Sequence, residues 1–63
     1  MKEFIAQNPK QLDLCLKLLY SENLEFIVKV DETEKRKIFY KICVKVEGQM
    51  YEELKEKYRI LIS

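Results

Sequence analysis

The sequence predicts a small α+β domain with the element order β-α-β-β-α. Three observations predict it: an Asn-Pro pair marks a helix start, two neighbouring segments alternate apolar and polar residues, and the C-terminal segment is amphipathic. The chain has 63 residues, of which 48% are hydrophobic. That length and composition support one domain with a single core, and a domain this small is only marginally stable on its own.

The first strand and helix follow from signals near the N-terminus. Residues 2–7 form a short segment with an apolar bias, which predicts a strand. A helix is expected over 9–22, because Asn8 can cap its first turn and Pro9 can occupy its first position, where a missing N–H costs nothing. Asn23 then suits the left-handed position after the helix, with Leu24 as its apolar contact.

The next two segments predict an antiparallel hairpin. Residues 24–30 and 37–46 alternate apolar and polar positions, so the even-numbered residues of both segments share one face. The charged segment 31–36 forms the loop. Opposed residues on one face must have numbers that sum to an even value, so the loop holds an odd number of residues or one strand carries a bulge. The even-numbered stripe is expected to face the helices.

The C-terminal segment 49–62 is predicted to be a helix, and both helices are expected on one sheet face. Most of its apolar side chains fall within about 120° of helical arc; they are Met50, Tyr51, Leu54, Tyr58, Leu61 and Ile62. Two alternatives remain open. A β-meander would turn at Glu47-Gly48, and a shorter helix followed by a strand at 59–62 would complete a ferredoxin-like βαββαβ fold.

Composition narrows the class of function. The chain has no His and no Trp, and its 12 basic and 11 acidic residues give a net charge of +1. A dedicated nucleic-acid binder is usually strongly basic, and no apolar run approaches the roughly 20 residues that span a bilayer. With no signal peptide, we expect a cytoplasmic protein. The abundance of Lys, Glu and Ile is typical of AT-rich coding sequence and indicates a bacterial or phage source.

No residue pattern points to catalysis or to a cofactor. The acidic residues cluster in the hairpin loop and on the polar side of the last helix, where we expect solvated charge; the clusters are Asp31, Glu32 and Glu34, and Glu52, Glu53 and Glu56. Cys15 should point into the core and Cys43 away from it, which places them too far apart for a disulfide. Without His or a Cys-x-x-Cys pair, a metal site is not expected, and no small-molecule ligand is evident.

The first helix carries more apolar surface than one sheet contact needs. Its core face consists of Leu12, Cys15, Leu16 and Leu19. Leu14 and Leu18 lie about 100° or more from the centre of that face, one turn apart. They are either a partner surface or the flank against which the C-terminal helix packs.

The outer sheet face is the second candidate surface. Ile27, Phe39 and Cys43 are expected to point outward, among Lys29, Lys37, Lys41 and Lys45. Aromatic and lysine side chains on an open sheet can bind single-stranded nucleic acid. Such a face can equally contact a protein, or remain in solvent with lysines that oppose aggregation.

These observations predict a non-enzymatic protein-interaction module, such as a regulator, inhibitor or adaptor, that contacts another protein or a second copy of itself as a dimer. The candidate surface comprises Leu14, Leu18, Ile27, Phe39, Lys41 and Cys43. The alternative is a weak single-stranded nucleic-acid binder that uses the outer sheet face.

Overall fold

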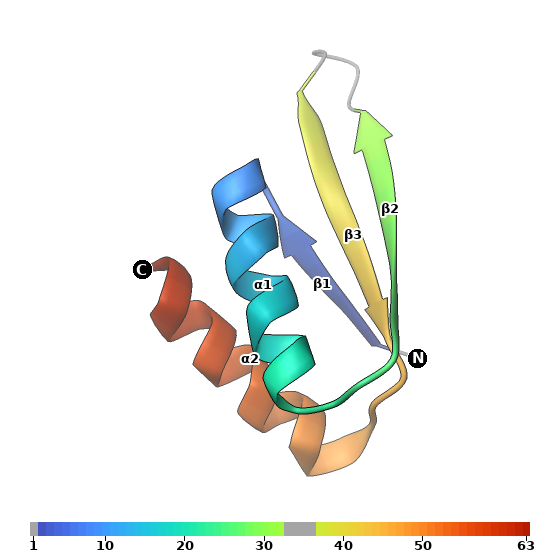
Figure 1. The fold of residues 1–63 in the computed structure, drawn as a ribbon, viewed down its shortest axis with the longest axis vertical. Coiled ribbons are helices and arrows are strands. Elements are labelled where there is room, and N and C mark those ends of the chain that lie inside the picture. Colours follow the sequence, from blue (N-terminus) through green and yellow to red (C-terminus); the bar gives the residue numbers. More distant parts are fainter. Residues whose placement is uncertain (1, 33–36) are drawn as a thin grey trace.

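A computed structural model of the chain describes residues 2–32 and 37–63. The elements follow the predicted order β-α-β-β-α. They are β1 (Lys2–Ala6), α1 (Pro9–Ser21), β2 (Phe26–Glu32), β3 (Ile38–Val44) and α2 (Gly48–Ile62). Figure 1 shows both helices packed on the same side of one sheet.

The three strands form one antiparallel sheet in the order β1-β3-β2. The hairpin register places Phe26 opposite Val44 and Val28 opposite Ile42, so opposed residue numbers sum to an even value. The connection between β2 and β3 spans residues 33–37, an odd number, as the pattern predicts. Of the predicted loop 31–36, residues 31 and 32 belong to β2, and 33–36 lie outside the described residues.

The ends of α1 form as the sequence predicts. The Asn8 side chain accepts a hydrogen bond from the Gln11 N–H at 2.8 Å, and Pro9 occupies the first turn. At the other end Asn23 has a φ of 57°. The N–H of Asn23 donates to the carbonyl of Tyr20 and that of Leu24 to the carbonyl of Leu19, the bonding pattern of a Schellman motif.

The C-terminal segment is helical through Ile62, which excludes both the β-meander and a strand at 59–62. Leu54 and Tyr58 are buried, and Tyr51 and Ile62 pack against the core. Met50 and Leu61, which the periodicity groups with them, are exposed at the rims of this face. The arc in contact with the core is therefore narrower than the apolar arc in the sequence.

The core lies between the even-numbered sheet face and the two helices. Phe4 and Ala6 of β1, Ile42 and Val44 of β3, and Cys15 and Leu19 of α1 contribute to it, together with Val46, Leu54 and Tyr58. Leu12 and Leu16 are half-buried against it, as predicted for the core face of α1.

The even-numbered stripe does not face the helices along its whole length. Val30 is 67% exposed and Ile38 is 54% exposed, although both lie on the core side of the hairpin by register. Figure 1 shows the reason: the far end of the hairpin extends past both helices and past β1. The expectation of a fully covered stripe is wrong at this end.

Candidate functional site

The two edges of the sheet differ in how they are covered. On the β1 edge, the Tyr51 hydroxyl donates to the Glu3 carbonyl at 3.1 Å, and the Tyr58 hydroxyl donates to the Ile5 carbonyl at 2.9 Å. Both rings also contact Phe4 edge-on, with centroids 5.5 and 5.8 Å apart. Helix α2 thus occupies backbone acceptors that a new strand would need, which protects this edge from further pairing.

Among residues 2–32 and 37–63, no side chain covers the β2 edge in this way, and this edge faces away from both helices (Figure 1). The N–H of Lys45 donates to the Glu25 carbonyl at 3.2 Å, so residues 25 and 45 form a hydrogen-bonded antiparallel pair. Because such pairs alternate along a ladder, the odd-numbered residues of β2 point their backbone groups toward β3. The N–H and C=O groups of Phe26, Val28 and Val30 therefore point outward along the open edge.

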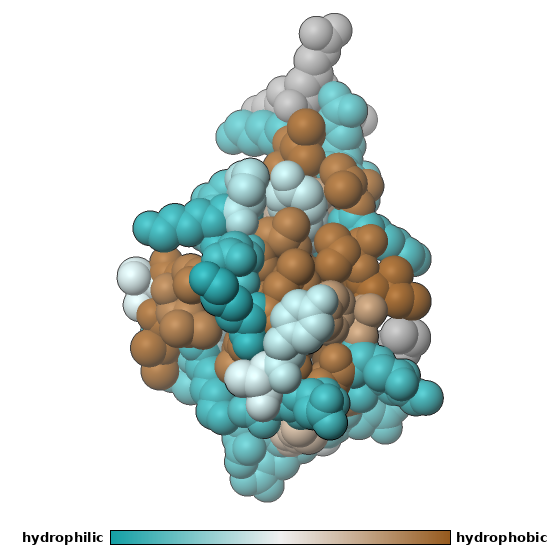
Figure 2. Space-filling model, in the orientation of Figure 1, coloured by the Kyte–Doolittle hydropathy of each residue, from teal (hydrophilic) through white to brown (hydrophobic). Residues whose placement is uncertain are grey.

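Apolar residues of the hairpin reach the surface beside this open edge and at the far end of the hairpin. Ile27 is 56% exposed on the outer face, and Val30 and Ile38 are exposed near the far end. Tyr20, at the end of α1, is 70% exposed and packs edge-on against Phe26 with ring centroids 5.3 Å apart. Figure 2 shows hydrophobic residues at the surface along the hairpin, where a monomer leaves apolar area in water.

On the outer sheet face the register brings the predicted residues into adjacent rows. Cys43 lies between Glu3 and Ile27, and its thiol is 3.9 Å from a Glu3 carboxylate oxygen. The Lys41 ammonium is 3.5 Å from Asp31 and 5.9 Å from the centre of the Phe39 ring. Phe39, Lys41 and Cys43 are half-buried, so Ile27 is the most exposed of the four predicted residues here.

Leu14 and Leu18 lie on a different side of the molecule from these four. They share a row of α1 with Glu22, one turn apart at each step. The Glu22 carboxylate, at the C-terminal end of this row, forms an ion pair with Lys57 of α2 at 3.0 Å. Leu18 packs against the core and Leu14 is half-buried.

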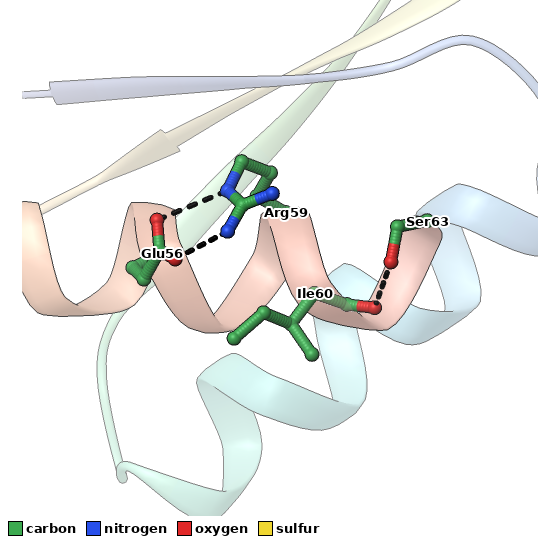
Figure 3. A network of polar contacts seen from close by, with 4 residues as sticks. All are labelled: Glu56, Arg59, Ile60 and Ser63. Atoms are coloured by element: carbon green, nitrogen blue, oxygen red, sulfur yellow. Dashed lines mark hydrogen bonds and ion pairs between the residues drawn. The ribbon is translucent and has the colours of Figure 1, made fainter.

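A shallow groove runs between β1 and α2, and its rim is charged. Arg59 hydrogen-bonds the Glu56 carboxylate through two nitrogens (Figure 3), which lowers the pKa of Glu56. Lys55 pairs with Glu52 at 3.2 Å. Beyond the groove, the Ser63 hydroxyl donates to the Ile60 carbonyl at 2.8 Å at the end of the helix. These pairs are exposed contacts within one helix, whose energies are small.

The cysteines occupy opposite environments, as predicted. Cys15 is fully buried and Cys43 is partly exposed, and both are free thiols. Burial raises the pKa of the Cys15 thiol to about 11. Among residues 2–32 and 37–63, no group of His, Cys, Asp or Glu is arranged to hold a metal ion. None of the helices described there is long and apolar enough to cross a membrane.

Comparison of the chain with protein-family models, curated proteins and solved structures gives no significant match. The surfaces above therefore have to be interpreted from their own chemistry.

Sequence reasoning missed two parts of this site. The hydrogen bonds from Tyr51 and Tyr58 to β1 join residues that are far apart in the chain. The helical periodicity of α2 shows only that these two tyrosines face inward. The exposure of Val30 and Ile38 depends on where the helices end in space. The alternation of the hairpin does indicate the outward position of Ile27.

Proposed function

We propose that this chain is a non-enzymatic protein-interaction module that binds through the β2 side of its hairpin. The observation that carries the proposal is the contrast between the two edges of the sheet. The β1 edge is closed by tyrosine hydroxyls, whereas the outward backbone groups of β2 have no hydrogen-bond partner within the described part of the chain and lie beside exposed Ile27 and Val30. An open edge flanked by apolar side chains suits the addition of a strand from another protein.

The cytoplasm is the compartment that best fits this proposal. Both cysteines are free thiols, and Cys43 is partly exposed, where an oxidising compartment would favour its modification.

The outer sheet face is a weaker candidate for single-stranded nucleic acid. Stacking and phosphate contact there would require the Phe39 ring and the Lys41 ammonium. Lys41 is already close to the Asp31 carboxylate and to the Phe39 ring, and the net charge of +1 adds little attraction for phosphate. We therefore favour a protein partner.

Affinity capture with two matched variants tests the proposal. Ile27 and Ile60 are 56% and 58% exposed, on the sheet and on α2 respectively. The tagged chain is used to capture a binding protein, including a differently tagged copy of itself. We expect Ile27→Lys to abolish this association and Ile60→Lys to retain it. Equal retention by both variants would contradict the proposal. Salt-dependent binding to a single-stranded oligonucleotide, unaffected by Ile27→Lys, would favour the nucleic-acid function instead.

A further inference from the structure

We infer that the strand that pairs with the open edge is β2 of a second copy of this chain, in an antiparallel register centred on Ile27. This inference rests on the proposed function and names its partner. Two three-stranded sheets then join into one continuous sheet of six strands, with the helices of both copies on the same face.

Symmetry limits the possible registers. Two identical antiparallel strands are related by a two-fold axis perpendicular to the sheet, so opposed side chains lie on the same face and one residue must face its own copy. The outward N–H and C=O groups belong to the even-numbered residues of β2. When Ile27 faces Ile27, Phe26 and Val28 of the two copies exchange backbone hydrogen bonds in both directions.

Charge pairing favours the register centred on Ile27 over those centred on Val28 and Lys29. Centring on Ile27 places Phe26 opposite Val28 and Glu25 opposite Lys29, so every pair from 25 to 29 is apolar or oppositely charged. Centring on Val28 would place Glu25 opposite Asp31, and centring on Lys29 would place two lysines together. Within the described part of the chain, neither Glu25 nor Lys29 has an ion-pair partner.

The surface beside β2 complements this register. A hollow there is lined by Tyr20, Leu24, Glu25, Phe26, Ile27 and Lys45. In the Ile27-centred register, Val30 of the second copy lies opposite Leu24, on the face that carries Phe26 and Tyr20. Val30 is 67% exposed in one copy, so seating it in this hollow buries an apolar side chain that is otherwise in water.

Charge reversal tests the register in the full chain. Sedimentation equilibrium should show a dimer for the wild type. We expect Glu25→Lys and Lys29→Glu to raise the dimer dissociation constant at least about tenfold each, because each creates two like-charge pairs. The double variant Glu25→Lys/Lys29→Glu should restore the dissociation constant to within about threefold of the wild-type value. Lys10→Glu, an equal charge change on α1, should leave it unchanged.

Amide hydrogen exchange supplies a second readout. The N–H groups of Phe26 and Val28 should gain protection as protein concentration rises through the dissociation constant. The N–H of Ile27 points to β3 and should be protected at every concentration. Circular dichroism of each variant confirms that the fold is retained.

Three outcomes would overturn the inference: a wild-type monomer at millimolar concentration, a dimer that the single reversals do not weaken, or a double variant that stays dissociated. A wild-type monomer that still forms an Ile27-dependent complex with a different protein would overturn the homodimer but support the proposed function. If no association of the chain, with its own copy or with another protein, depended on Ile27, both the homodimer and the proposed function would be overturned.

Discussion

The two cysteines differ in their access to solvent. Cys15 is fully buried with its thiol pKa raised to about 11, whereas Cys43 is partly exposed on the outer sheet face. We expect a maleimide to label Cys43 in the native protein and Cys15 only on unfolding, because the thiolate is the reactive form. Mass spectrometry of the labelled chain measures this. Equal labelling, or a Cys15–Cys43 disulfide, would contradict the placement of the two thiols.

The same burial predicts how stability changes with pH. The folded state holds the Cys15 proton to a pH of about 11, whereas the unfolded chain releases it near 9. The folded state therefore binds more protons in this window, and the free energy of unfolding should fall as pH rises from 9 to 11. The Cys15 contribution to the slope is at most about 1.4 kcal/mol per pH unit. Burial also raises the pKa of Tyr58 to about 12, so part of the slope should persist in Cys15→Ala.

Denaturant titrations between pH 8 and 11 would measure this slope. We expect Cys15→Ala to show a shallower fall than the wild type. A slope that does not change in Cys15→Ala would show that the buried thiol does not titrate as described.

Helix α2 contributes most of its stabilisation through one face. Leu54 is 2% exposed within the core, whereas its neighbour Lys55 is exposed. Leu54→Ala should lower the free energy of unfolding by about 2–5 kcal/mol, and Lys55→Ala by less than about 0.5 kcal/mol. Chemical denaturation monitored by circular dichroism measures both. Similar small effects would show that α2 does not pack through Leu54.

The start of α2 depends on a glycine. Gly48 has a φ of 67°, and a Cβ built there would meet no atom within 4 Å. The cost of Gly48→Ala is therefore conformational, about 1–2 kcal/mol for a left-handed alanine. Gly48→Asn should cost less, because Asn enters this region more readily. Thermal denaturation should rank the variants in that order, and an alanine variant as stable as the wild type would contradict this account.

Local signals predicted the elements because their causes lie within a few residues. The Asn8 cap, the Asn23 conformation and the hairpin parity each depend on near neighbours, and each matches the structure. The hydroxyl bonds of Tyr51 and Tyr58 to β1 join residues 48 and 53 positions apart. Periodicity places those tyrosines on the inner face of α2 but does not show which backbone atoms they reach.

The lengths and the offset of α1 and β2 determine which part of the hairpin stays exposed. The 13 residues of α1 span about 20 Å, and the seven residues of β2 span about 23 Å. The hairpin starts beside the C-terminal end of α1 and runs past its other end (Figure 1). A sequence pattern records which face of a strand is apolar, but not where the covering helix stops. This is why the exposed ends of the hairpin stripe could not be predicted.

Leu14 lies on α1, so its contacts are distinct from the surface at β2. Leu14 is half-buried on α1, one turn from Leu18, which packs against the core. Leu14→Glu should therefore lower the free energy of unfolding, by about 1–3 kcal/mol, because a charge is partly buried without a partner. Ile60→Glu, at an exposed position of α2, should cost little.

Sedimentation of Leu14→Glu beside Ile27→Lys gives the comparison that decides between the two surfaces. We expect the folded fraction of Leu14→Glu to keep the assembly state of the wild type, whereas Ile27→Lys should stay folded and lose it, because a lysine would then face its own copy across the edge. If Leu14→Glu instead dissociated the assembly without loss of stability, the row on α1 would be the contact between chains. The open edge of β2 would then not be the contact between chains.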